Sequence, residues 1–234
     1  MGEKSSFVHL LDKIEAQDRR LDMVLKNVRS LSDSENMELA YSAALKLAED
    51  SEKMTLLTRA LPAYTGNPRA AQDMETVVEK VVPVEVGFTI EGCFCVRLPL
   101  LLPKKEEGSA SYIRGILYPV LRDFFRDKEP IRYPESVMVF RHVYNVERPE
   151  RRYRDHDNIE LNMVSDAIAM YVMDDDAPPC CDHFYCSAAS SWERTEIYVI
   201  PAQDFTRWLM LEYLIPDEGV MLHEHIPRRF QKHM

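Results

Sequence analysis

The apolar residues at the start of the chain recur in alternating steps of three and four, and this spacing constrains the fold more than any other feature. The series runs through Phe7, Leu10, Ile14, Gln17, Leu21, Val24, Val28 and Leu31, with Gln17 as its polar member. This is the heptad a/d spacing of a helix that packs along its length against another helix. We therefore predict a long helix over this segment.

A second helix is predicted directly after the first. Ser32-Asp33-Ser34-Glu35 supplies candidates for the N-cap and acids for the first turn. The residues expected on its packed side are Met37, Tyr41, Leu45, Ala48, Met54 and Leu57, and the helix should end near Pro62. We predict a helical hairpin over residues 1–66. It serves either as a packing or dimerisation arm or as a docking surface for a protein partner.

The pattern changes after Thr65-Gly66-Asn67-Pro68, a loop that we take as a domain boundary. Strands are expected at 77–102 (one or two, interrupted at Pro83), 136–144, 182–187 and 195–200, with a turn at 188–191. Helices are expected at 111–126 and 158–172. This alternation predicts an α/β (α+β) domain with a mixed sheet over residues 75–205. Residues 206–234 should form a C-terminal helix and a basic tail.

The chain carries 39 acidic and 29 basic residues, a formal net charge of -10. Nucleic-acid-binding proteins usually present a basic face to phosphates, so this excess lowers the expectation of tight DNA binding. It fits a protein that binds other proteins or holds divalent cations. No stretch of 18 apolar residues is present, so we expect no membrane span. The lack of a signal-peptide pattern and the odd number of cysteines, five, favour a cytoplasmic protein.

Three aspartates form the most informative pattern. Asp155 and Asp157 flank one residue just before the predicted helix 158–172, and Asp176 follows that helix. Side chains two apart in an extended segment point the same way, and a reversing strand would bring Asp176 back beside them. Three converging carboxylates suit Mg²⁺ or Mn²⁺, which can activate water for attack on a phosphodiester. The structural alternative is an N-cap at Asp155 or Asp157 and a solvated turn around Asp176.

The sequence around these aspartates resembles the signature block of the RusA family of Holliday-junction resolvases. The shared features are the run Arg151-Arg152-Tyr153-Arg154-Asp155-His156-Asp157-Asn158, an apolar helix with Asp166-Ala167, and then Asp175-Asp176-Ala177. The order of strands and helices on either side also agrees. The resemblance covers residues 75–205 and leaves the N-terminal helices without a counterpart.

The resemblance implies an activity and a set of site residues. RusA proteins are homodimeric, Mg²⁺-dependent endonucleases that cleave branched DNA and are often carried by phages and other mobile elements. By this resemblance, Asp155, Asp157 and Asp176 are the catalytic, metal-binding acids, with Asp175 as a further metal-site residue. The residues implied to hold DNA are Arg151, Arg152, Arg154, His156 and Asn158.

Two positions depart from the family pattern. The family places a catalytic lysine four residues after its second acid, where this chain has Leu161. The family's helix aspartate falls at Ser165 here, and Asp166 comes one residue later. Losing a cation beside the scissile phosphate removes about 3–4 kcal/mol of transition-state stabilisation, unless His156 or Arg154 replaces it. The departures leave an alternative open: a catalytically lapsed RusA-like protein that binds a protein or nucleic-acid partner.

Two further expectations concern assembly and zinc. The predicted helix 158–172 is apolar on more than one face, so we expect a homodimer that buries it. Cys180, Cys181, His183 and Cys186 lie close together in the sequence, but adjacent cysteines rarely face one ion. We favour core and surface roles for these residues over a zinc site.

Overall fold

The computed structural model describes residues 2–128, 131–147, 158–211 and 220–227. The chain divides into two compact units, Met1–Val77 (unit 1) and Val78–Met234 (unit 2), and each is described by itself. The predicted class, α+β with a mixed sheet, is confirmed. No helix in the described ranges is both long enough and apolar enough to cross a membrane.

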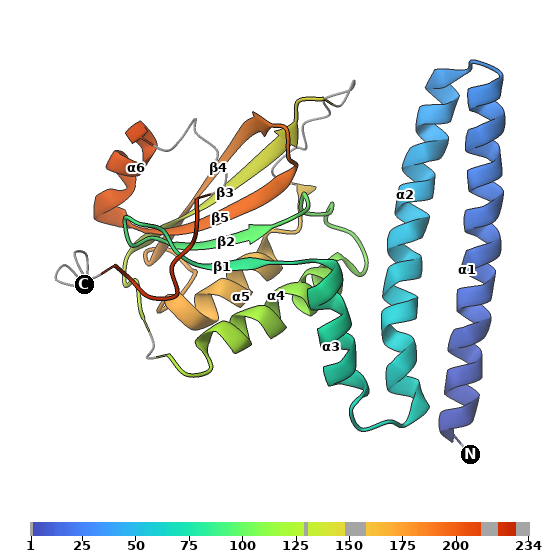
Figure 1. The fold of residues 1–234 in the computed structure, drawn as a ribbon, viewed down its shortest axis with the longest axis horizontal. Helices are drawn as coiled ribbons and strands as arrows, with labels where there is room; N and C mark the ends of the chain where they lie inside the picture. The colour runs from blue at the N-terminus through green and yellow to red at the C-terminus, as the bar shows by residue number, and fades with distance from the viewer. Residues whose placement is uncertain (1, 129–130, 148–157, 212–219, 228–234) are drawn as a thin grey trace. The chain divides into compact units, whose positions relative to one another are not determined.

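Unit 1 is built on a helical hairpin (Figure 1). α1 (Gly2–Asp33) and α2 (Met37–Ala60) run antiparallel. Asn36, rather than the predicted segment 32–35, caps α2, because its Oδ1 accepts from the backbone N–H of Leu39 at 3.4 Å. α2 continues into the 3₁₀ helix η1 (Leu61–Thr65). Gly66 then adopts a φ of 74°, a left-handed conformation that suits glycine and ends the helical run.

The seam between the two helices follows the heptad on α1 but is displaced on α2. The predicted heptad residues of α1 are all half-buried. On α2 the predicted side is wrong at its start, since Met37 is 65% and Leu45 52% exposed. Ala40 and Asp50 are buried instead. The α2 seam therefore runs through positions 40, 43, 47, 50 and 54.

An ion pair between a buried aspartate and a half-exposed arginine lies in the middle of this seam. The Asp50 carboxylate is fully buried, and its Oδ2 accepts from Arg20 Nε at 2.9 Å. Lys46 Nζ lies 3.8 Å from Asp50 Oδ1. Gln17, the polar member of the heptad, donates from Nε2 to the Asp50 carbonyl at 2.8 Å. A polar contact of this kind fixes which turns of two helices meet, because any shift would leave buried groups unpaired.

Unit 2 contains a five-stranded mixed sheet. Its strands are β1 (Glu85–Phe88), β2 (Phe94–Leu98), β3 (Ser136–Asn145), β4 (Cys181–Ser190) and β5 (Arg194–Pro201). They lie in the order β1-β2-β5-β3-β4. All neighbours are antiparallel except β3 and β4, which are parallel. The helix before β4 supplies the crossover that a parallel pair requires.

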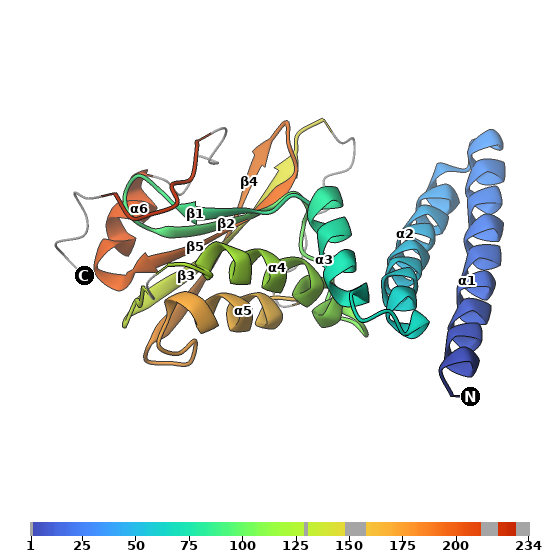
Figure 2. The ribbon, with the colours of Figure 1, turned by 60° about the horizontal axis from the view of Figure 1, so that its bottom comes forward.

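Helices pack on both faces of this sheet. Successive strand residues point to opposite faces, so Phe94 and Tyr198 mark different sides. The Phe94 ring lies 5.6 Å from that of Phe125, at the end of α4 (Ser109–Phe125). α4 and α5 (Asn162–Val172) lie side by side on that face (Figure 2). On the other face, Trp208 of α6 (Phe205–Leu211) packs with its ring 5.5 Å from Tyr198.

Three predicted boundaries change. Residues 77–81, expected in a strand, belong to the helix α3 (Ala70–Val81). Val78 and Val82 are buried whereas Val77 and Val81 are exposed, a helical spacing that the run of valines conceals. α5 begins at Asn162 rather than at residue 158. β4 extends through the predicted turn to Ser190.

Candidate functional site

The segment that leads into α5 is held against a stretch that precedes α4. Lys105 N–H donates to the Asn158 carbonyl at 3.1 Å, and Glu160 N–H donates to the Pro103 carbonyl at 2.9 Å. Asn158 is exposed, as are Lys104 and Lys105. The backbone of residues 158–160 is therefore fixed beside two exposed lysines.

A buried glutamate joins the first turns of α4 and α5. Glu160 is 4% exposed. Its Oε2 accepts from Ser109 Oγ at 2.7 Å, and its Oε1 accepts from the N–H of Met163 at 3.4 Å. It therefore caps α5, since Leu161 at the N-cap has no side-chain acceptor. The sequence analysis did not single out Glu160, because an acid beside a helix start looks like an ordinary first-turn residue.

Leu161, which stands where the resemblance expects a lysine, is part of the core. Its side chain is 7% exposed. Ser165, in register with the family's helix aspartate, is also buried, and its Oγ donates to the Leu161 carbonyl at 3.2 Å. Both residues that depart from the RusA pattern therefore pack in the core at the start of α5, and neither carries a charge.

Asp166 on α5 and Asp176 beyond its end interact directly. Burial raises the pKa of the Asp166 carboxyl, and the charge of Asp176, a hydrogen bond with Asp176 and the charge of Glu160 raise it further. Asp176 is half-buried. Asp166 itself is exposed, and the negative charge of Asp176 disfavours its ionised form. A divalent cation at this pair would neutralise both carboxylates.

The charge of Asp176 also acts on β4. Burial lowers the pKa of His183, and the carboxylates of Asp176 and Asp182 oppose that change by favouring the imidazolium. His183 Nδ1 lies 3.1 Å from the hydroxyl of Tyr185, two residues along the same strand. The charge of Asp176 thus affects the pKa of an acidic group on α5, Asp166, and of a basic group on β4, His183.

Asp175 has a local structural role. Its Oδ1 accepts from the N–H of Ala177 at 3.1 Å, which closes an Asx turn between α5 and β4. Asp174 and Asp175 are exposed. Of the predicted pair of metal-site residues in this turn, Asp176 is the one that approaches another carboxyl group.

Most of the residues assigned by the resemblance lie outside the described ranges. They are Asp155, Asp157, Arg151, Arg152, Arg154 and His156. In the part of the chain that the structure describes, no three His, Cys, Asp or Glu side chains are grouped so that they could hold a metal ion. Mg²⁺ or Mn²⁺ at Asp166 and Asp176 would therefore need further oxygen ligands.

The cysteine-rich stretch does not form a zinc site among these residues. Cys181 and Cys186 lie five apart on β4, so their side chains point to opposite faces of the sheet. All five cysteines are free thiols, and four of them are buried. Burial raises the pKa of Cys186 to about 11, although the charge of Arg141 opposes this, so its thiol stays neutral.

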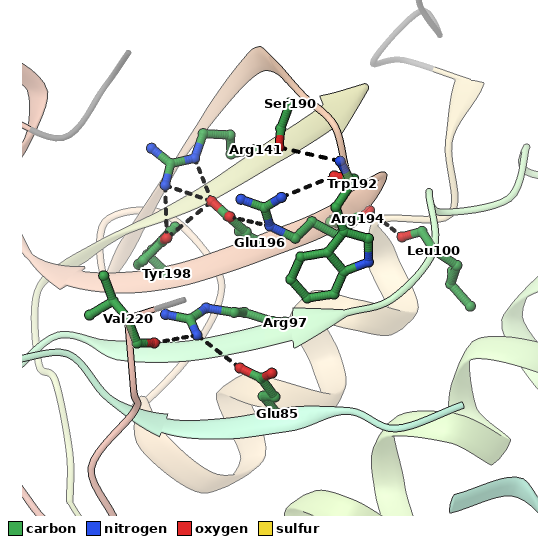
Figure 3. A network of polar contacts seen from close by, with 11 residues as sticks. Glu85, Arg97, Leu100, Arg141, Ser190, Trp192, Arg194, Glu196, Tyr198 and Val220 are labelled. Carbon is green, nitrogen blue, oxygen red and sulfur yellow. Dashed lines mark hydrogen bonds and ion pairs between the residues drawn. The ribbon is translucent and has the colours of Figure 1, made fainter. Parts of the chain in front are cut away.

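A buried network of charges occupies the sheet face opposite α4 and α5 (Figure 3). Glu196 Oε2 accepts from Arg141 Nε at 2.6 Å, and its Oε1 accepts from Arg194 Nε at 2.7 Å. Tyr198 accepts from Arg141 Nη2 at 2.8 Å and donates to Glu196 Oε2 at 3.1 Å. Arg194 Nη1 donates to the Trp192 carbonyl at 3.0 Å. All three charged side chains are almost completely buried.

A third buried arginine, Arg97, lies on the same face. Arg97 Nη1 donates to Glu85 Oε2 at 2.8 Å and to the Val220 carbonyl at 2.6 Å (Figure 3). It thereby attaches a C-terminal segment to the sheet. These arginine contacts could not be predicted from the sequence, because alternate polar residues in a strand predict a solvated face. Only the register, which pairs Arg141 with Glu196 across β3 and β5, brings the charges together.

Comparison with known proteins identifies a family but no activity. Residues 3–225 match the model of a family of unknown function, DUF6100. No curated protein and no solved structure matches the chain.

Proposed function

The chain belongs to DUF6100, a family of unknown function, and from its own residues we propose that unit 2 is a divalent-metal-dependent endonuclease domain acting on branched DNA. The observation that carries the proposal is the proximity of the Asp166 and Asp176 carboxyl groups, through which Asp176 helps to raise the pKa of Asp166. The RusA resemblance assigns Asp176, together with Asp155 and Asp157, to the metal site.

The chemistry of the donors fits Mg²⁺ or Mn²⁺. Carboxylate oxygens are the ligands that these hard cations prefer. The raised pKa of Asp166 means that its ionised form is unfavourable until a cation neutralises the pair. A bound divalent ion would supply an activated water and neutralise charge on the scissile phosphate. Asp155 and Asp157 are proposed as the remaining carboxylate ligands.

Cationic groups near the acids are part of the proposal. Leu161 is buried in the core and supplies no charge. Lys104 and Lys105 are exposed on the segment whose backbone pairs with Asn158 and Glu160. We propose that these two lysines contact the DNA backbone and so take the role that the catalytic lysine has in the RusA family. Lysine suits this role because its ammonium group is a compact positive charge on a flexible side chain and can pair with phosphate.

A second candidate function is a RusA-like domain that binds a partner without cleaving it. Two observations favour it. Leu161 and Ser165 are both core residues, so the departures from the family pattern are built into the packing. Residues 67–234 contain 28 acidic and 20 basic residues, which disfavours tight binding to DNA.

A junction-cleavage assay distinguishes the two functions. The full-length protein is incubated with a four-way DNA junction in Mg²⁺ or Mn²⁺, and with Ca²⁺ for binding alone. The first candidate predicts cleavage that falls about 100-fold or more in Asp176→Asn, the loss expected for a group that stabilises transition-state charge. Asp174→Asn, an exposed acid in the same turn, is the matched control and should cleave normally.

The other outcomes are equally informative. Junction binding without cleavage in either metal would favour the second candidate. Equal cleavage by wild type and Asp176→Asn would contradict the proposed site. If the protein neither binds nor cleaves the junction, the nuclease proposal is contradicted and the second candidate remains only with a protein as its partner. Thermal melts of each variant establish that any loss of activity does not reflect unfolding.

A further inference from the structure

The hairpin of unit 1 leaves much of its apolar surface uncovered. Within residues 6–33 of α1, no side chain is fully buried, and the heptad residues are only half-buried. Two antiparallel helices cover one stripe on each other and leave the flanks of that stripe open. Helical pairs of this kind commonly complete a core by forming four-helix bundles.

One flank of the hairpin is apolar on both helices. Leu25 directly follows the seam residue Val24 on α1, and Tyr41 directly follows the seam residue Ala40 on α2. In two antiparallel helices, the residue that directly follows a seam residue lies on the same side of the pair in both helices, because a two-fold axis relates the helices. Met37 lies one turn before Tyr41 on the same stripe. We call Leu25, Met37, Tyr41, Ala44 and Ala48 the Leu25 face.

The exposure of this face is large. Leu25 is 49% exposed and Met37 is 65% exposed. Ala44 and Ala48 are also exposed, and they are small enough to let another helix approach closely. Exposed large apolar residues beside small ones are typical of a surface that contacts another helix.

The charges beside Leu25 suit a second copy of the same surface. Asp22, Leu25 and Arg29 lie at positions i, i+3 and i+7, so they follow one line along α1. A two-fold axis at Leu25 would place Asp22 of one copy opposite Arg29 of the other. Asp22 already pairs with Lys26 at 2.6 Å within its own helix, and Arg29 is exposed. The surface is therefore self-complementary, as a two-fold interface requires.

The overall charge of the hairpin agrees with this partner. Residues 1–66 contain nine basic and eleven acidic residues. Two nearly balanced surfaces repel each other little, whereas a nucleic-acid partner would require a basic excess. The acidic excess of the chain lies mainly in residues 67–234, which do not contribute to the Leu25 face.

We propose that two copies of this chain associate through the Leu25 face, hairpin against hairpin, as a four-helix bundle. The proposal goes beyond the nuclease function and does not depend on it. It also differs from the dimer that we expected from helix α5. Val164, Ala167 and Ile168 of that helix are already buried within the chain, whereas its Met170 is 53% exposed.

The test is the mass of the full-length protein in solution, by light scattering and sedimentation at micromolar concentrations. The wild type should be a dimer. Leu25→Glu with Met37→Glu should raise the dissociation constant about 100-fold or more, because the interface would then bury like charges. The matched control is Met23→Glu with Leu39→Glu. These residues are 64% and 54% exposed and precede the seam residues, so they lie on the opposite flank.

A charge exchange gives a second, independent test. Asp22→Arg alone should weaken the dimer, and Asp22→Arg with Arg29→Asp should restore it, because the exchanged pair is again complementary. Circular dichroism should show unchanged helix content in every variant. A monomeric wild type would overturn the proposal. So would equal dissociation constants for the test and control double variants, whether or not they differ from that of the wild type.

Discussion

Glu196 accepts hydrogen bonds from two guanidinium groups in the interior of unit 2. Each buried charge loses its hydration, a cost that only close pairing offsets. Arg141 and Arg194 both depend on this carboxylate, and Tyr198 uses its hydroxyl to connect Arg141 to it. Removing the carboxylate would leave two buried cations with too few acceptors.

We therefore predict that Glu196→Ala lowers the free energy of unfolding by about 3–5 kcal/mol, the usual result of breaking a buried ion pair on one side. Glu85→Ala is the control. Its carboxylate is half-exposed, and Arg97 keeps the Val220 carbonyl as an acceptor, so that loss should be about 1 kcal/mol or less. Urea denaturation measures both, and equal losses would contradict this account of the network.

The pair Asp166 and Asp176 predicts a dependence of stability on pH. Burial and the neighbouring carboxylate raise the pKa of Asp166 in the folded state. A raised carboxyl pKa favours folding when the group is protonated, and this contribution disappears as the pH rises through the folded-state pKa. Asp166→Asn cannot ionise, so in metal-free buffer it should melt above the wild type at neutral pH.

The difference should vanish well below pH ~4, where aspartate is protonated in folded and unfolded chains alike. Asp174→Asn provides the control, because Asp174 is exposed in the turn after α5. Thermal melts across this pH range make the comparison. An Asp166→Asn variant that melts with the wild type at every pH would show that the two carboxyl groups do not interact.

At the scale of elements, periodicity predicted most of the sheet and its helices. β3, β5, α4 and the body of α5 have long apolar patterns, and they lie where those patterns indicated. The failures have a common physical cause. Valine is frequent in strands, which conceals the helical spacing of Val78 in α3 and Val82 just after it. On α2, Ala40 and Asp50 form the seam, and a search for large apolar residues passes over both.

The start of α5 carries a prediction of its own. Leu161 is buried there, so Leu161→Lys would bury an ammonium without a partner. We expect the free energy of unfolding to fall by about 2–3 kcal/mol, in the upper part of the range for single substitutions, with no gain in any cleavage activity. Asn162→Lys changes the neighbouring, exposed residue and should be nearly neutral. A stable Leu161→Lys protein with increased cleavage would contradict the assignment of Leu161 to the core.

At the scale of the whole molecule, the sequence predicted an α+β chain with an N-terminal helical hairpin, and the structure has these features. The candidate site was predicted less completely. Spacing and resemblance pointed to Asp176, but they did not reveal its contact with Asp166, which depends on how the turn after α5 folds back. They also could not reveal that Glu160 is buried, because its partner Ser109 is distant in the sequence.

We propose that unit 2 holds a divalent cation through Asp176. Thermal melting of the full-length protein in tenfold steps of Mn²⁺ tests it most directly, since a ligand that binds only the folded state stabilises it by RT ln(1 + [L]/Kd). We predict that the wild type and Asp174→Asn gain about 1.4 kcal/mol per tenfold step above Kd, whereas Asp176→Asn gains much less. Identical, metal-indifferent melting curves for all three proteins would contradict the claim.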